Sequence, residues 1–272
     1  MRLDDDQPSD ASIGDRDLTR WRSRLGHGLV GLARRLARTF SADSVLYVTS
    51  AIGGVVVVAL LVVGGQIYEA VEEGDGIAGF DRPVLDAALS LRTATNTRVL
   101  TVFTHLGGPV GMTIIATAIT VLMVWRWRSR TPLFLMLLAV AGSLTMTNVG
   151  KAIVGRARPP LADAVPPYEY AFSFPSGHAL NSTVISGMVA YLVMAHLRTR
   201  IARAGAVLAA VVWSVSMGLS RVFLGHHWLT DVMFAWVIGL AWIGVLVTAH
   251  RLFLTVRRRR REEPQSAQEL VD

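Results

Sequence analysis

Residues 45–68 read VLYVTSAIGGVVVVALLVVGGQIY and contain no charged side chain. An α-helix needs about 20 predominantly apolar residues to cross the roughly 30 Å hydrocarbon layer of a bilayer. This stretch is long enough, because an α-helix rises about 1.5 Å per residue. We therefore expect residues 45–68 to form a membrane-spanning helix.

The composition of the whole chain agrees with this expectation. Of its 272 residues, 52% are hydrophobic and only 17% are charged, whereas soluble domains carry about 25% charged residues. These values exclude a soluble globular domain. The chain also contains no cysteine, which excludes a disulfide framework, thiolate catalysis and a Cys-ligated metal.

Five further stretches are similarly apolar. The six stretches predict an all-α fold, a polytopic membrane protein with six transmembrane helices forming a helical bundle. The expected spans cover residues 45–68, 100–125, 132–154, 178–197, 204–224 and 228–254. We also expect a short helix at residues 81–91, within the loop that follows the first span.

Three parts of the chain follow from these spans. Residues 1–43 form a polar, Arg-rich segment that is either disordered or an interfacial helix on the membrane surface. Residues 44–254 form the six-span domain, and residues 255–272 form a basic, polar tail.

The charged residues between the spans predict the topology. Arginines follow the second, fourth and sixth spans, so the positive-inside rule assigns these loops and both termini to the cytoplasm. The net charge of +7 is spread over these segments, which suits an anionic membrane surface and provides no single patch for nucleic acid. The strong preference for arginine over lysine is typical of a GC-rich bacterium. We therefore expect a multi-pass protein of the bacterial inner membrane.

Ionisable residues inside the spans are the first candidates for a functional site. Between residues 99 and 261 the only acids are Asp163, Glu169 and Asp231, and Asp231 alone lies within an apolar span. Lys151, the single lysine of the chain, also lies within a span. Such residues mark function by default, since their burial is costly. The alternative is an interior ion pair that only locks two helices together.

Two local patterns add to these candidates. In the sequence Phe174-Pro175-Ser176-Gly177-His178, Ser176 is a good N-cap residue, and free amides at a helix start can bind phosphate oxygens. The same pattern is also common in ordinary turns. His227 and Asp231 are four residues apart, so on one helix the carboxylate can orient the imidazole, as a nucleophilic or basic histidine requires. The neighbouring His226 does not have this spacing, and we expect it to be an interfacial residue.

The expected topology brings these candidates to one membrane face. Lys151, Arg221, His178 and His227, with the loop at residues 155–175, all lie toward the outside. This excess of positive charge requires an anion. Arginine guanidinium groups match phosphate oxygens in a bidentate manner, and a lysine adds a point charge.

Taken together, three blocks resemble the signature of the type 2 phosphatidic acid phosphatase family, which is also called the lipid phosphate phosphatase and vanadium haloperoxidase superfamily. The blocks are Lys151 followed after six residues by Arg158-Pro159, then Pro175-Ser176-Gly177-His178, and then Ser220-Arg221 followed by His227 and Asp231. All three match in order and without a gap or substitution. The resemblance spans residues 44–254 and implies the membrane branch of the family.

The resemblance implies a role for each matching residue. His227 attacks the phosphorus to form a phosphohistidine, Asp231 holds the tautomer of His227, and His178 protonates the leaving oxygen and then activates water. The phosphate is bound by five residues: Lys151, Arg158, Ser176, Gly177 and Arg221. No metal and no other cofactor is implied. Arg156 lies outside the motif, and we expect its replacement by alanine to have little effect.

The same resemblance implies a metal-independent hydrolase for a phosphorylated membrane lipid, working at the outer face of the bilayer. Candidate substrates are undecaprenyl diphosphate, phosphatidylglycerophosphate and phosphatidic acid. Three alternatives remain open from the residues. They are a vanadate-dependent haloperoxidase, a transporter or channel with Lys151 and Asp231 as a buried gate, and a phosphotransferase with the same site.

Overall fold

The computed structural model describes residues 44–268, and describes side-chain environments from residue 47 to residue 257. The segment predicted at residues 1–43 lies outside the described residues. Within residues 44–268 the chain is helical and contains no strand. The elements in chain order are α2 (Ser44–Glu73), η1 (Gly76–Phe80), α3 (Asp81–Ser90), α4 (Ala94–Leu106), α5 (Pro109–Trp127), α6 (Thr131–Val154), η2 (Leu161–Asp163), α7 (Gly177–Met194), α8 (Arg200–Phe223) and α9 (Leu229–Gln268).

Five of the described helices are long and apolar enough to cross a membrane. They contain the segments Tyr47–Glu73, Pro109–Trp127, Thr131–Val154, Arg200–Phe223 and Leu229–Arg257. The remaining expected span, residues 178–197, corresponds to α7, which forms as a helix but is not among the five. Polar residues such as Asn181, Ser182 and Thr183 reduce its hydropathy. The all-α membrane fold is therefore confirmed, and the number of six spans stays a prediction.

The second expected span begins later than the sequence indicated. Residues 100–106 belong to the separate helix α4, and the long helix α5 starts only at Pro109. Proline at a first helical position is favourable because it lacks the N–H that would have no intrahelical partner. At Gly107 an added Cβ would lie 2.3 Å from the sulfur of Met217. The chain therefore turns at residues 107 and 108 close against α8.

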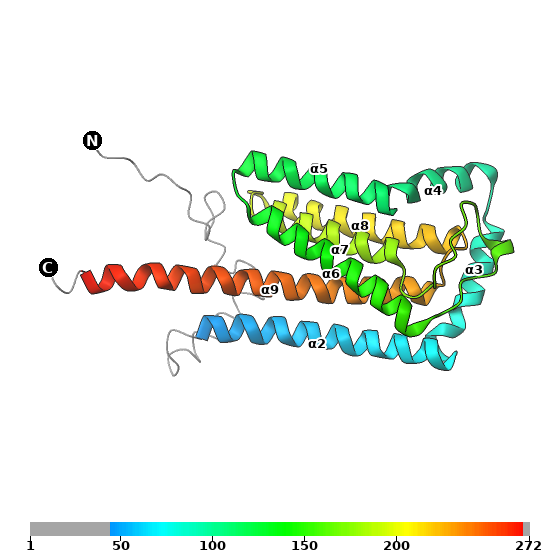
Figure 1. Cartoon of the computed structure of the whole chain (residues 1–272), viewed down its shortest axis with the longest axis horizontal. Coiled ribbons are helices and arrows are strands. Elements are labelled where there is room, and N and C mark those ends of the chain that lie inside the picture. The colour runs from blue at the N-terminus through cyan, green and yellow to red at the C-terminus, as the bar shows by residue number, and fades with distance from the viewer. Residues whose placement is uncertain (1–43, 269–272) are drawn as a thin grey trace.

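The helices run up and down the bundle, so that four helix ends meet at one end of the molecule (Figure 1). The C-terminal ends of α6 and α8 lie there with the N-terminal ends of α7 and α9. The loop at residues 155–175 and helix α3 also lie at this end, which we call the site end. The topology thus collects residues that are far apart in sequence.

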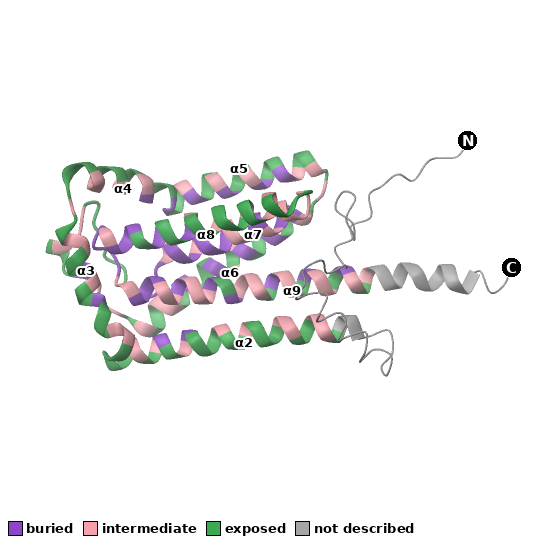
Figure 2. Cartoon of the chain, turned by 180° about the vertical axis from the view of Figure 1, so that it is seen from behind, coloured by how far each residue is buried: buried purple, intermediate pink, exposed green. Residues whose placement is uncertain are grey.

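Helix α7 is the centre of the packing. It contacts α5, α6, α8 and α9, and Leu180, Val184 and Met188 on it are fully buried. Figure 2 shows buried residues concentrated along α7 and on the inward faces of its neighbours, while much of α2 and α5 is exposed. Exposed apolar residues such as Val55 and Ile114 suit contact with lipid tails, which are as apolar as a protein core.

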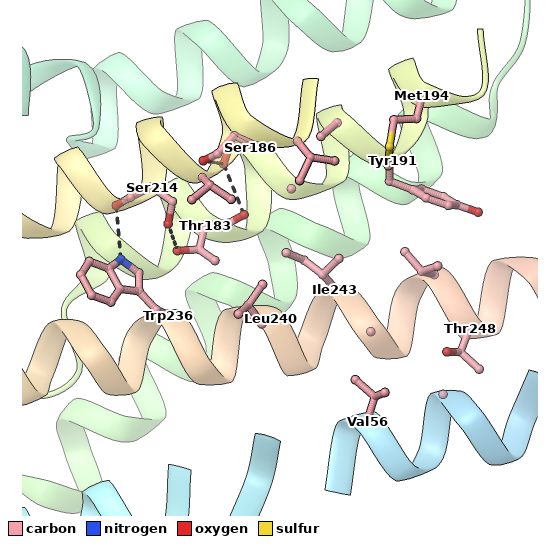
Figure 3. A pocket seen from close by; sticks show the side chains of 18 of the residues that line it. Val56, Thr183, Ser186, Tyr191, Met194, Ser214, Trp236, Leu240, Ile243 and Thr248 are labelled. Carbon is pink, nitrogen blue, oxygen red and sulfur yellow. Dashed lines mark hydrogen bonds between the residues drawn. The ribbon is translucent and has the colours of Figure 1, made fainter. Parts of the chain in front are cut away.

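An apolar pocket lies between α2, α7, α8 and α9, with a volume of about 680 Å³ (Figure 3). It occupies the half of the bundle away from the site end, as the positions of Tyr191, Met194 and Thr248 indicate. Two of its polar groups bond to each other, since Thr183 Oγ1 lies 2.5 Å from Ser214 Oγ. Among the described residues that line this pocket, none belongs to the predicted site.

Candidate active site

All of the predicted site residues lie at the site end. Lys151 is in the last turn of α6 and Arg221 in the last turn of α8, while Asp231 is in the first turn of α9. Ser176 is the N-cap of α7, where its Oγ accepts a hydrogen bond from the Ala179 N–H at 3.5 Å. Arg158, Gly177, His178 and His227 lie in the loops or the first turn beside them.

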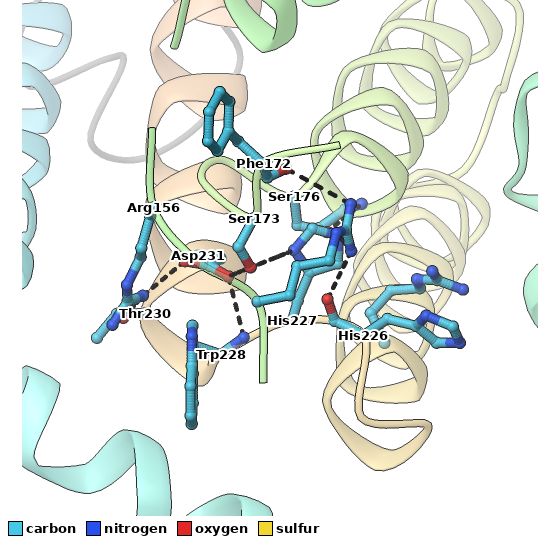
Figure 4. Close-up of polar contacts among 12 residues, drawn as sticks. Arg156, Phe172, Ser173, Ser176, His226, His227, Trp228, Thr230 and Asp231 are labelled. Carbon is cyan, nitrogen blue, oxygen red and sulfur yellow. Dashed lines mark hydrogen bonds and ion pairs between the residues drawn. The ribbon is translucent and has the colours of Figure 1, made fainter. Parts of the chain in front are cut away.

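His227 and Asp231 form a buried pair in the site. Their Nδ1 and Oδ2 atoms are 3.3 Å apart, and their side chains are 1% and 0% exposed. The same Oδ2 accepts hydrogen bonds from the Trp228 backbone N–H at 3.0 Å and from the Ser173 hydroxyl. Figure 4 shows Asp231 enclosed by these groups. A carboxylate so placed fixes the proton of the imidazole on Nδ1 and leaves a lone pair on Nε2.

The other ring nitrogen of His227, Nε2, faces Arg158. His227 Nε2 lies 3.3 Å from Nη1 of Arg158. Burial, followed by the nearby cations of Arg158 and Arg221, holds the pKa of His227 well below its ordinary value. The imidazole is therefore neutral at physiological pH, which is the form that can attack an electrophile.

A tight turn places His227 between α8 and α9. Gly225 has φ of +73°, in the left-handed region, and a Cβ at this position would lie 2.3 Å from the carbonyl oxygen of Asp163. The turn also packs against the long loop, because the Val165 N–H donates to the Leu224 carbonyl oxygen at 2.9 Å. Only glycine satisfies both conditions without strain.

Three cationic side chains lie at the site end with His227, and one of them, Arg158, contacts it. Arg158 donates to the backbone oxygen of His226 at 2.6 Å, and Arg221 donates to Thr104 Oγ1 at 3.0 Å. Lys151 donates to the backbone oxygen of Phe172. Preorganised cations in a partly buried site can stabilise the charge of a phosphoryl group in its transition state. The phosphate-binding role of the three residues stays a prediction.

Glu169 joins two of these cations, although the sequence had suggested no role for it. Its Oε2 lies 2.8 Å from Nη2 of Arg158, and its Oε1 contacts Nη2 of Arg221. Burial by itself raises the pKa of the Glu169 carboxyl, but Arg221 and Arg158 outweigh this effect and lower the pKa to about 2. Glu169 is therefore ionised at physiological pH. Its rarity, as one of three acids between residues 99 and 261, was the available signal.

Arg156 lies outside the phosphate-binding group, as expected, but it binds Asp231 directly. Its Nη1 lies 2.6 Å from Asp231 Oδ1 and its Nη2 lies 2.7 Å from Asp81 Oδ2. Asp81 in turn accepts hydrogen bonds from the backbone N–H and the hydroxyl of Thr230. The expectation that Arg156 is dispensable does not fit this geometry, because its guanidinium holds the second oxygen of Asp231 (Figure 4).

The other histidines are placed differently. His226 is 4% exposed, so it is buried rather than interfacial. Burial, followed by the charge of Arg221, lowers its pKa to about 4. His196 stacks on Trp127 and His250 contacts Tyr191, both at the end of the bundle away from the site. Among the described residues, no group of three or more His, Cys, Asp or Glu side chains is arranged to hold a metal ion.

Comparisons with known proteins agree with this geometry. The family model of the PAP2 superfamily matches residues 132–254, which include every predicted site residue. The chain is 31% identical over 176 residues to phosphatidylglycerophosphatase B of Bacillus subtilis (strain 168), and the match covers 64% of this chain and 85% of that relative.

A solved structure is also similar. It is the crystal structure of the first transmembrane PAP2 type phosphatidylglycerolphosphate phosphatase from Bacillus subtilis, with a TM-score of 0.63 and 26% sequence identity. The similarity covers 70% of this chain and 93% of that structure. The sequence similarity and the structural similarity thus indicate the same family. The chain belongs to the PAP2 superfamily and is a membrane phosphatase.

Proposed function

We propose that the chain hydrolyses a phosphomonoester or diphosphate of a membrane lipid through a phosphohistidine intermediate. The observation that carries this proposal is the orientation of His227. Its Nδ1 is held by the buried Asp231, while its Nε2 faces Arg158. A neutral imidazole with a free nitrogen beside a cation is ready to attack a phosphorus atom whose oxygens the cation binds.

The first half of the reaction transfers the phosphoryl group to the enzyme. The lone pair of His227 Nε2 forms a bond to phosphorus while the bond to the lipid oxygen breaks, and His178 donates a proton to that leaving oxygen. Asp231 stabilises the imidazolium character that develops on His227. Lys151, Arg158 and Arg221, with the Ser176 hydroxyl and the Gly177 amide, bind the three equatorial oxygens.

The second half returns the enzyme to its starting state. His178, now neutral, removes a proton from a water molecule, whose oxygen attacks phosphorus as the bond to His227 Nε2 breaks. Inorganic phosphate leaves and the lone pair returns to His227. No metal enters either half, because the three cations supply the positive charge that the transferring group requires.

The substrate and the topology belong to the same proposal. Both Bacillus subtilis proteins are named as phosphatases of phosphatidylglycerophosphate, so this lipid is the first candidate, ahead of phosphatidic acid and undecaprenyl diphosphate. We infer that α7 completes six spans, with both termini in the cytoplasm and the site at the outer face of the bacterial inner membrane. There a lipid can offer its phosphate while its tails stay in the bilayer.

Phosphate release by the purified protein in detergent, with EDTA present, tests the proposal. The wild type is expected to hydrolyse at least one of the three lipids, and His227→Ala is expected to be inactive. His196→Ala is the matched control, because His196 lies at the opposite end of the bundle. Activity retained in folded His227→Ala, or lost with EDTA in the wild type, would refute the mechanism.

Trapping the intermediate separates this mechanism from direct attack by water. A phosphohistidine survives alkaline quenching, so mass spectrometry of the quenched enzyme during turnover is expected to find phosphate on His227. Phosphate on no histidine, at a time when product accumulates, would argue for direct hydrolysis.

A further inference from the structure

Glu169 lies between two arginines that the proposed function assigns to phosphate binding. One carboxylate oxygen binds Nη2 of Arg158 and the other binds Nη2 of Arg221. The carboxylate therefore binds two of the three cations that the proposed reaction needs for its substrate.

A carboxylate and a phosphoryl group are alternative ligands for such a pair. Each offers two oxygens that can bridge two guanidinium groups with charge-assisted hydrogen bonds. Both cannot occupy the bridging position between Nη2 of Arg158 and Nη2 of Arg221 at the same time. A substrate phosphate that binds in this bridging position must therefore displace Glu169.

The structure gives Glu169 a way to leave. Its side chain is 31% exposed, whereas that of Arg221 is 3% exposed, so the carboxylate lies on the open side of the buried cation. The neighbouring Tyr168 and Tyr170 are also exposed. The loop is fixed on both sides of this stretch, by the hydrogen bond from Val165 to Leu224 and by one from the Ser173 N–H to the Arg156 carbonyl oxygen. A displacement can thus be confined to the residues between them.

We propose that Glu169 is an internal ligand of the phosphate subsite, which the phosphoryl group of the substrate displaces and which returns as inorganic phosphate leaves. This inference rests on the proposed function and adds a residue to it. While the subsite is empty, Glu169 neutralises two closely spaced cations. While phosphate is leaving, it competes for the same donors.

The consequence is a lower affinity for every anion that uses both arginines. When the binding-competent state is only a fraction of the population, the apparent dissociation constant is the intrinsic one divided by that fraction. Two charge-assisted hydrogen bonds can hold Glu169 in place for most of the time. Removing its charge is then expected to tighten the binding of free phosphate by roughly 10- to 100-fold.

The test measures the binding of inorganic phosphate and of orthovanadate to the full chain in detergent by calorimetry. Glu169→Gln retains the size of the side chain and removes its charge, and it is expected to bind both anions roughly 10- to 100-fold more tightly than the wild type. The KM for phosphatidylglycerophosphate is expected to fall with it. Glu72→Gln, the same change at an exposed position near the end of α2, is the matched control and is expected to change neither value.

Glu169→Asp provides a second, charge-retaining variant. Its side chain is shorter by one methylene group and cannot bridge the two arginines equally well, so its anion affinity is expected between those of the wild type and Glu169→Gln. A Glu169→Gln protein that is folded and binds phosphate no more tightly than the wild type would overturn the inference. Weaker phosphate binding by Glu169→Gln would overturn the inference too, because the loss of a residue that only supports the structure of the site is expected to weaken binding.

The two proposals fail in different ways. If the wild type neither binds phosphate nor releases it from any of the lipids, the proposed function is wrong. If the wild type does both and Glu169→Gln matches it in affinity and KM, only the role of Glu169 is wrong. Calorimetric binding does not depend on turnover, so the distinction holds even if Glu169→Gln is catalytically slow.

Discussion

Replacing Arg156 by alanine leaves two buried carboxylates without the cation that they share. Asp231 is 0% exposed and Asp81 is 6% exposed at the side chain, and the guanidinium bonds to them at 2.6 and 2.7 Å. Alanine removes both ion pairs and the hydrogen bond to Thr230 at once. Because Asp231 is 0% exposed, water does not easily take the place of the guanidinium.

The size of the effect follows from the burial of these partners. Breaking a buried ion pair by removing one member costs about 3–5 kcal/mol, because the other charge is left uncompensated. For a chain of this size each kcal/mol lowers the melting temperature by about 2–4 °C. We therefore expect Arg156→Ala to melt roughly 6–20 °C below the wild type. Activity is expected to fall as well, since Asp231 loses a partner that positions it.

Thermal unfolding in detergent, followed by intrinsic tryptophan fluorescence, measures this change. Arg82→Ala is the matched control, because Arg82 also pairs with two carboxylates but is 52% exposed. Exposed ion pairs contribute about 0–1 kcal/mol, so the control is expected to melt within about 4 °C of the wild type. Arg156→Lys keeps the charge without the bidentate geometry, and is expected to fall between wild type and Arg156→Ala.

A double variant sharpens the interpretation. Adding Asp81→Asn to Arg156→Ala removes one of the two uncompensated charges, so the double variant is expected to be more stable than the sum of the single losses predicts. If Arg156→Ala melts within about 2 °C of Arg82→Ala, the guanidinium does not neutralise the buried carboxylates and the reasoning is refuted.

Three further predictions concern the site and the turn that supports it. Asp231→Asn is expected to lower kcat by roughly 10²- to 10⁴-fold while KM changes little, because the amide favours the wrong tautomer of the His227 imidazole. An unchanged kcat would mean that Asp231 has only a structural role. Gly225→Ala is expected to lower the free energy of unfolding by more than about 1 kcal/mol, whereas Gly205→Ala, where an added Cβ meets nothing within 4 Å, is expected to have no such cost. Because the pKa of Glu169 is lowered from 4.5 to about 2, its ion pairs stabilise the fold above pH 4.5, and this contribution is lost as pH falls toward 2. The difference in melting temperature between wild type and Glu169→Gln is therefore expected to shrink between pH 6 and pH 3, and a constant difference would contradict the ion pairs.

The apolar runs made most of the fold predictable. The helices over Thr131–Val154 and Arg200–Phe223 follow closely the stretches expected at residues 132–154 and 204–224, because in a membrane the length of an apolar run largely determines a helix. The break before Pro109 was missed, since the residues on both of its sides are apolar. The local pattern Gly107-Gly108-Pro109 marks the break, and Gly107 lies close against Met217 there.

The residues of the candidate site also fall into those that the sequence predicted and those that it did not. Residues of the three motif blocks, such as His227 and Arg158, are recognisable because their spacing is fixed within short segments. Asp81 and Arg156 had no such spacing, since each meets its partner in the site from about 75 residues away in the chain. A contact of that kind depends on the tertiary packing, and one sequence alone does not contain it. For Glu169 the only indication in the sequence was the scarcity of acidic residues between residues 99 and 261.

The shared ion pairs of Arg156 also bear on how the protein is made. Synthesis is vectorial, so Asp81 and Arg156 emerge from the ribosome before the helix that begins at Leu229. The carboxylate of Asp231 therefore enters the membrane region when its counter-ion is already present. The pair of His227 and Asp231 is local to the start of α9, but it meets Arg158 and Arg156 only when α9 docks. Docking of α9 thus assembles the candidate site, and we expect a nascent chain that stalls before residue 229 to have no phosphatase activity.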